Sequence, residues 1–235
     1  MLTITLALLA GCAQKKDVDA MEARLAALEE KVATLEKRAP AGPASSAEEE
    51  AANAVMKGVT EATKNNDYAT AKAKLQELMA KHSNTKAGKA AEKMYREVGL
   101  VGADAKPIDV EKWYQGKAAL GDKPVTLLVF WEIWCPHCKR EMPELAKREQ
   151  DLEKMGIQIV GLTKVTKSAT EDKVLEFMKE SEIDFPMAKE KEGSMSEAYN
   201  VSGIPAAALV KDGKVIWRGH PGRLDDATLA KLVGA

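Results

Sequence analysis

The feature that most limits the possible folds is an apolar run that leads directly into a pair of cysteines. Residues 124–131, PVTLLVFW, are almost entirely apolar and rich in β-branched side chains, as expected of a strand buried on both faces of a sheet. Cys135 and Cys138 follow. Residues 139–156 then show helical periodicity and end at a glycine suited to a helix C-terminus, with Pro143 expected to kink the helix. The cysteine pair is therefore predicted to lie where a buried strand passes into a helix.

The remainder of the C-terminal half alternates between strand and helix signals. Residues 157–163 form a second apolar run of strand length, and Asp212-Gly213 between two apolar stretches is a strong hairpin signal. In chain order, the expected elements are strands at 124–131 and 157–163 around the helix at 139–156, helices at 169–182 and 193–201, two strands within 206–219, and a closing helix at 225–235. This alternation predicts an α/β domain that covers residues 104–235.

Residues 47–103 have a different, wholly helical character. The predicted helices are 47–64, 67–81 and 85–98. The breaks between them contain Asn, Asp, Ser and Thr residues that offer side-chain N-caps, and Ser46 with Glu49 matches a capping box. The pattern resembles one tetratricopeptide-type hairpin, whereas arrays of such units normally need about three copies. The segment is predicted to be a spacer or a docking domain, and simple packing against its neighbour is an equally open alternative.

A heptad pattern precedes this helical segment, within residues 15–38. The apolar positions are Val18, Leu25 and Val32 at a, and Met21, Leu28 and Leu35 at d. Charges at the e and g positions are mostly of opposite sign across a parallel pairing, which favours a parallel homo-oligomer. The pattern covers less than three full heptads, so a single amphipathic stalk helix is the alternative. Residues 39–46, rich in Pro, Gly and small side chains, are predicted to be a linker.

The third cysteine, Cys12, ends an apolar run at the N-terminus. The run is too short to span a bilayer, which takes about 20 residues, and has the length of a signal-peptide core. Its last residues, LAGC, resemble the lipobox of bacterial lipoproteins, although no Lys or Arg precedes the run. The resemblance implies that residues 1–11 are removed, that residues 12–38 combine a lipid anchor on Cys12 with the coiled coil, and that the protein is exported to the periplasmic face of the cell envelope. Ala13 in place of Asp favours the outer membrane over the inner one, by analogy with lipoprotein sorting. The alternative is a stray cysteine on an apolar N-terminus.

If Cys12 carries lipid, Cys135 and Cys138 can pair only with each other or with another molecule. The thiolate is the nucleophile of disulfide exchange, and the positive end of a helix dipole favours the anion. Cys135 is therefore predicted to have a lowered pKa and to attack a substrate disulfide. Cys138, one turn inside the helix, is predicted to resolve the mixed disulfide. His137 lies between them and is expected to stabilise the Cys135 thiolate as a hydrogen-bond donor.

Composition and residue counts weigh against the other uses of such a pair. The net charge is −1 with 30% charged residues, so no basic excess points to nucleic acid. A zinc site needs about four ligands, and beyond the cysteine pair the chain offers only His82, His137 and His220. We therefore expect no metal. A purely structural disulfide is a further alternative.

The stretch 130–145, FWEIWCPHCKREMPEL, resembles the active-site stretch of the thioredoxin superfamily, and in particular of its TlpA/ResA-type exported branch. Trp134 before the motif and Glu141, six residues after the first cysteine, match that branch. Residues 203–205, GIP, resemble the superfamily's cis-proline loop. The resemblance extends over residues 105–235. Val129 stands where ordinary thioredoxins have a buried Asp, which is a departure from their pattern.

The resemblance implies a thioredoxin-like mixed sheet flanked by helices and a role for each matching residue. Glu141 would assist proton transfer from the resolving cysteine. Ile204-Pro205 would be a cis bond that faces the cysteines and aligns the substrate backbone. Trp134 and the dipeptide Pro136-His137 would support the active site. That dipeptide differs from the Glu-Pro common in reducing members and matches an oxidant of the superfamily, so the direction of the reaction stays open.

These observations predict an exported, membrane-anchored thiol–disulfide oxidoreductase with a CPHC active site, which acts as a reductase. Disulfide oxidase or isomerase activity is one alternative. An envelope scaffold that uses the thioredoxin-like domain as a binding module is another. The expected partners are protein thiol or disulfide substrates, a membrane redox protein, the membrane itself through Cys12, and further copies of the chain through residues 15–38. No cofactor and no nucleic acid are expected.

Overall fold

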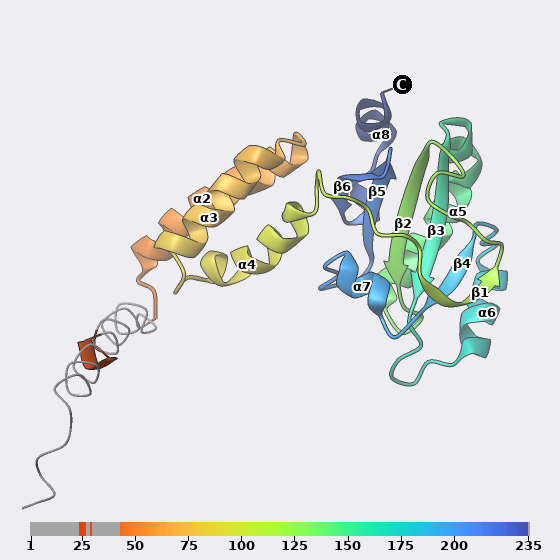
Figure 1. Cartoon of the computed structure of the whole chain (residues 1–235), viewed down its shortest axis with the longest axis horizontal. Coiled ribbons are helices and arrows are strands. Elements are labelled where there is room, and N and C mark those ends of the chain that lie inside the picture. The colour runs from red at the N-terminus through yellow and green to blue at the C-terminus, as the bar shows by residue number, and fades with distance from the viewer. Residues whose placement is uncertain (1–23, 27–28, 30–42, 235) are drawn as a thin grey trace, which may run out of the picture. The chain divides into compact units, whose positions relative to one another are not determined.

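The structure is a computed structural model of the chain that describes residues 24–26, 29 and 43–234 (Figure 1). The chain divides into two compact units, Met1–Ser45 and Ser46–Ala235. In the first unit, the described residues 24–26 and 29 are helical. The predicted signal peptide, the lipid-bearing Cys12 and most of the predicted coiled coil lie outside the described residues, and these assignments stay predictions.

The second unit begins with three helices, α2 (Ser46–Lys64), α3 (Tyr68–Lys81) and α4 (Lys86–Gly99). Asp67 and Thr85 cap α3 and α4, because each side chain accepts a hydrogen bond from a main-chain N–H one turn into its helix. The three helices enclose a core of their own, which includes Ala52, Val59, Leu75, Leu78 and Ala91. The predicted helices are therefore confirmed to within two residues, whereas the domain boundary after residue 103 stays a prediction.

The predicted capping box at the start of α2 is wrong in its details. Ser46 is the first helical residue and not the cap. The carboxylate of Glu49 accepts hydrogen bonds from the main-chain N–H of Lys86 at 3.1 and 3.3 Å. Glu49 thus satisfies an unpaired donor at the start of α4 and ties the first helix to the third.

Six strands follow and form one mixed sheet. They are β1 (Val110–Gln115), β2 (Val125–Trp131), β3 (Ile157–Thr163), β4 (Met187–Glu190), β5 (Ala206–Lys211) and β6 (Lys214–Gly219). Their order across the sheet is β1-β4-β3-β2-β5-β6. The central strand β2 is parallel to β3 and antiparallel to β5, and every one of its residues is buried. The expected α/β fold with a thioredoxin-like mixed sheet is therefore confirmed.

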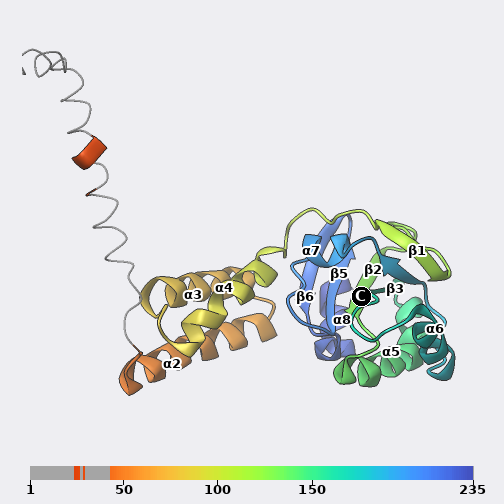
Figure 2. The ribbon, with the colours of Figure 1, turned by 90° about the horizontal axis from the view of Figure 1, so that it is seen from below.

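Helices cover both faces of this sheet (Figure 2). They are α5 (Pro136–Lys154), α6 (Glu171–Glu180), α7 (Ser194–Ala198) and α8 (Asp226–Val233). Side chains of β2 alternate between the two cores: Leu127 and Val129 pack with α5, α6 and α8, whereas Leu128 and Phe130 pack with α7. α5 continues through Pro143 and ends before Gly156, which has the positive φ of 76° expected at a helix C-terminus.

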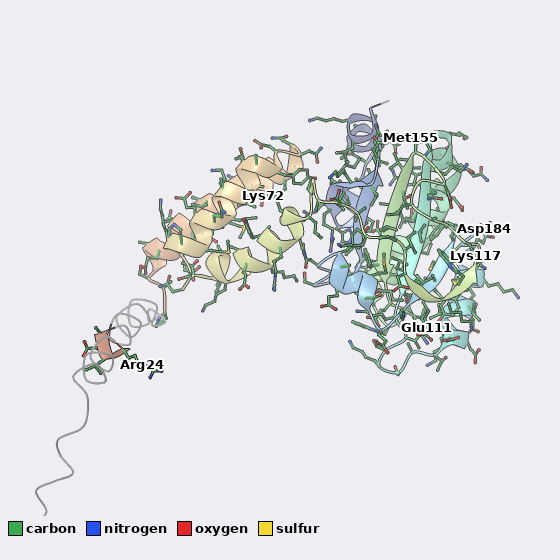
Figure 3. All side chains as sticks on the ribbon, viewed as in Figure 1. Arg24, Lys72, Glu111, Lys117, Met155 and Asp184 are labelled. Carbon is green, nitrogen blue, oxygen red and sulfur yellow. The ribbon has the colours of Figure 1, made fainter. Side chains whose placement is uncertain are left out.

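The strand β1 was not expected from the sequence. It lies at the edge of the sheet, pairs antiparallel with β4, and has no fully buried residue. Lys189 on β4 bridges Glu111 on β1 and Glu171 at the start of α6, with Nζ–Oε1 distances of 2.8 and 3.2 Å (Figure 3 labels Glu111).

Among residues 24–26, 29 and 43–234, none of the helices combines the length and the apolar composition that crossing a membrane requires.

The close packing of β3 against β4 generates a prediction about stability. A Cβ added to Gly161 would lie 2.4 Å from Met187 Sδ, and Met187 is fully buried and accepts a hydrogen bond from Trp131 Nε1. We expect Gly161→Ala to lower the free energy of unfolding by about 1–3 kcal/mol through overpacking. Gly99→Ala is the matched control, because nothing lies within 4 Å of its Cβ position at the end of α4. Urea unfolding of both variants tests this, and equal free energies of unfolding would contradict the prediction.

Candidate active site

The two cysteines lie where β2 passes into α5, as the sequence predicts. Cys135 is the N-cap of α5, and its Sγ accepts a hydrogen bond from the main-chain N–H of Cys138 at 3.4 Å. Pro136 occupies the first turn of the helix, where its missing N–H leaves no bond unmade. The Cys135 sulfur thus faces the unpaired N–H groups at the positive end of a helix of 19 residues, an environment that favours an anion.

The two thiols have different surroundings. Both are free, and their residues are 4% exposed for Cys135 and 0% for Cys138. Burial, followed by the hydrogen bond with Cys135, holds the pKa of the Cys138 thiol well above its ordinary value. A hydrogen bond from the main chain of Glu132 opposes this rise, and the Glu132 charge adds to it. Cys138 is therefore a shielded, protonated thiol at neutral pH.

The loop before β5 closes the site from the opposite side. The Ile204-Pro205 peptide bond is cis, and Cys135 Sγ donates a hydrogen bond to the Ile204 carbonyl at 3.6 Å. Pairing of Phe130 with Ala206 in adjacent strands sets this contact, because it brings the start of β5 beside the end of β2. The carbonyl directly before the cis-proline of the GIP motif thus contacts the first cysteine.

Two of the predicted site residues have partners other than the cysteines. His137 is exposed, and Arg140 Nη2 lies 2.7 Å from its Nδ1. Since arginine can only donate, this ring nitrogen is the acceptor, and His137 shows no hydrogen bond to Cys135 in the described part of the chain. The expected donation from His137 to the Cys135 sulfur is thus not observed.

Glu141 is half-buried and faces the turn Pro221–Arg223. A Cβ placed on Gly222 would lie 3.1 Å from both of its carboxylate oxygens and 3.2 Å from His220 Nδ1. His220 caps this turn by accepting a hydrogen bond from the Gly222 N–H at 3.1 Å. Within the described residues, no hydrogen bond joins Glu141 to either cysteine.

The structure adds a site residue that the sequence reasoning missed. Glu132, three residues before Cys135, is only 5% exposed. Its Oε2 accepts hydrogen bonds from Trp134 Nε1 at 2.6 Å and from the Thr166 hydroxyl. Lys167 Nζ lies 3.0 Å from the centroid of the Trp134 ring. Glu132 could have been identified from the sequence because it is a charged residue inside the apolar stretch FWEIW, and carboxylates are seldom buried without partners.

The site holds no metal-binding arrangement in the part of the chain that the structure describes. There, no group of three or more His, Cys, Asp or Glu side chains is placed to ligate an ion. What the site offers chemically is a nucleophilic sulfur at a helix N-terminus, a second sulfur within reach of it, and the main chain of the cis-proline loop beside the first sulfur. These are the groups that thiol–disulfide exchange uses.

Known proteins with similar sequences and folds agree with this geometry. The chain is 34% identical over 90 residues to a thiol-disulfide oxidoreductase ResA of Bacillus thuringiensis subsp. konkukian, a match that covers 38% of this chain and 50% of the relative. The Bacillus subtilis ResA is 32% identical over 90 residues, which covers 38% of this chain and 49% of the relative. The matched region thus spans about half the length of these curated relatives.

The fold is shared with a candidate thiol:disulfide interchange protein DsbE from Chlorobium tepidum. The two structures align with a TM-score of 0.50 at 22% identity, over 57% of this chain and 98% of the other. The family model of the AhpC/TSA family matches residues 101–218, half of the chain, and includes both cysteines and the cis-proline. The resemblance to thioredoxin-like oxidoreductases is thus confirmed, and the chain belongs to the AhpC/TSA family.

Proposed function

We propose that this protein exchanges disulfides with protein substrates through Cys135 and Cys138, and that it acts as a reductase. The observation that carries the proposal is the position of the Cys135 sulfur. It lies at the N-terminus of α5 and contacts the carbonyl of Ile204, directly before the cis-proline. A substrate disulfide beside that carbonyl would meet the sulfur at the end of the helix dipole that favours its thiolate.

The two thiols supply both electrons and both protons that reduction of a substrate disulfide requires. The Cys135 thiolate attacks one sulfur of the substrate disulfide, and the other substrate sulfur leaves as a thiolate and takes up a proton. Cys138 then loses its proton and attacks Cys135, and the second substrate sulfur leaves and is protonated. The substrate gains two electrons and two protons, and the cysteine pair becomes a disulfide. A partner dithiol protein must return the electrons.

One feature of the site supports the reducing direction. Oxidants of this kind owe their high potential to stabilisation of the reduced form, in which a neighbouring histidine can take part. Here His137 is exposed and hydrogen-bonded to Arg140, so this stabilisation of the Cys135 sulfur is lacking.

The proposal places the protein in the cell envelope, attached through lipid on Cys12. Residues 12–38 would form an oligomeric stalk and residues 47–103 a helical spacer, and together they would hold the redox domain away from the membrane. This placement rests on the sequence patterns alone. The electron donor in this arrangement is a membrane redox protein with its own dithiol.

The different surroundings of the two thiols predict an order of reactivity. We expect iodoacetamide at neutral pH to alkylate Cys135 at least about tenfold faster than Cys138, because the thiolate is the reactive form and burial keeps Cys138 protonated. Mass mapping of the labelled peptides measures both rates and separates them from labelling at Cys12. Equal rates, or faster labelling of Cys138, would contradict the assigned roles.

The reduction potential tests the direction of the reaction. We expect equilibration of the full chain with glutathione to give a value close to that of thioredoxin, about −270 mV, and far from the oxidising DsbA, about −120 mV. Cys135→Ser should abolish reduction of a protein disulfide, and Cys138→Ser should trap a mixed disulfide on Cys135. A potential near the oxidising value would favour an oxidase or isomerase. Failure of the pair to form a disulfide at any glutathione ratio would leave a binding module.

A further inference from the structure

Glu132 is a buried carboxylate whose negative charge is not neutralised by an ion pair. It is 5% exposed, and its Oε2 accepts from two neutral donors, Trp134 Nε1 and the Thr166 hydroxyl. In the part of the chain that the structure describes, no Lys, Arg or His side chain forms a salt bridge with it. Two hydrogen bonds thus hold the carboxylate in one place.

The loop that follows β3 secures this arrangement from outside the cysteine motif. Thr166 and Lys167 are adjacent in this loop. The Thr166 hydroxyl donates a hydrogen bond to Glu132, and Lys167 Nζ lies 3.0 Å from the centroid of the Trp134 ring. A cation over the face of an indole is an attractive contact, and it strengthens the ring N–H as a donor. The loop therefore holds both the carboxylate and its tryptophan partner.

The same glutamate is joined to both cysteines through its main chain. Its carbonyl accepts a hydrogen bond from the Cys135 N–H at 3.0 Å, and its own N–H donates toward the Cys138 sulfur. Burial and the hydrogen bond with Cys135 raise the pKa of Cys138 most, and the charge of the Glu132 carboxylate makes a smaller contribution in the same direction. Glu141, the carboxylate that the family resemblance names, faces Gly222 instead.

We propose that Glu132 is a positioning residue of the redox site, whose buried carboxylate, held by Trp134 and Thr166 within the cysteine motif, slows closure of the Cys135–Cys138 disulfide. The inference rests on the proposed redox function. The overall reaction stays the same. Cys138 loses a proton and the departing substrate sulfur gains one, and Glu132 adds to the burial that makes Cys138 hold its proton. The mixed disulfide with a substrate lives longer as a result.

Other titratable groups belong to the elements that surround the cysteine motif and contribute to the pH dependence. The loop after β3 supplies Lys167, the exposed side of α5 supplies the pair His137 and Arg140, the turn after β6 supplies His220 next to Glu141, and Cys135 itself is the nearest thiol. None of these groups is hydrogen-bonded to the Glu132 carboxylate within the described residues. A change confined to that carboxylate therefore isolates its effect.

The test follows the release of thionitrobenzoate from Cys135 when Cys138 attacks it. The full chain carries Cys12→Ser in every variant, so that the label reaches only the active-site pair. We expect Glu132→Gln, which keeps the size and hydrogen-bonding capacity but loses the charge, to speed release by up to about threefold at a fixed pH. If the pKa of the Cys138 thiol falls by one unit, tenfold more thiolate is present, but each thiolate is less nucleophilic. The net increase in the release rate is about threefold. The pH–rate profile should also shift to lower pH.

The outcomes separate this inference from the proposed function. An unchanged or slower release in Glu132→Gln overturns the inference, and slower release would mean that the carboxylate accepts the proton. A wild-type chain that never releases thionitrobenzoate overturns the proposed function itself.

Two further variants guard against effects of folding. Glu190→Gln removes another buried carboxylate, which is 3% exposed and bound to the main chain and hydroxyl of Ser196 on β4 and α7. We expect it to leave the release rate unchanged. Thr166→Val removes one donor to Glu132 from an exposed loop position and should give a smaller acceleration in the same direction. If Glu132→Gln fails to fold, an unchanged rate and profile in Thr166→Val overturns the inference.

Discussion

The burial of β2 at the centre of the sheet is the constraint on which the rest of the structure depends. Its residues alternate between two cores, and it is paired along its length with β3 on one side and β5 on the other. A slip of one residue would move every side chain of the strand to the wrong face. The register therefore fixes where the strand ends, and with it the distance between Cys135 and the cis-proline loop that precedes β5.

Much of this framework could be predicted from the sequence, for a physical reason that differs between elements. Strands β2 and β3 are continuous apolar runs, and the hairpin between β5 and β6 has Asp212 and Gly213, both with positive φ. The helices α3 and α4 have side-chain caps that local sequence reveals. The edge strand β1 was missed because its residues are half-exposed and follow no clean alternation. Its pairing with β4, far along the chain, creates the strand.

The candidate site divides in the same way. Cys135 and Cys138 were predicted because the spacing of the motif and the end of the preceding strand determine their main-chain positions, whereas Pro205 was predicted from the resemblance to the thioredoxin superfamily. The directions of His137, Glu141 and Glu132 could not be predicted, because each depends on a neighbour supplied by the fold. Glu141 approaches the turn at Gly222 because that residue has no side chain. Glu132 is held by Thr166, which lies 34 residues away in the sequence.

The surroundings of the two carboxylates bear on how the proposed disulfide exchange would be controlled. A thiol that resolves a mixed disulfide at once gives its substrate little time to be exchanged or rejected. One that is held protonated beside a fixed negative charge reacts more slowly. Glu132 acts from inside the motif and is buried, so its charge is weakly screened, whereas Glu141 is half-buried beside a surface turn. The buried carboxylate is therefore the stronger influence on Cys138, although the resemblance to the family directs attention to the other one.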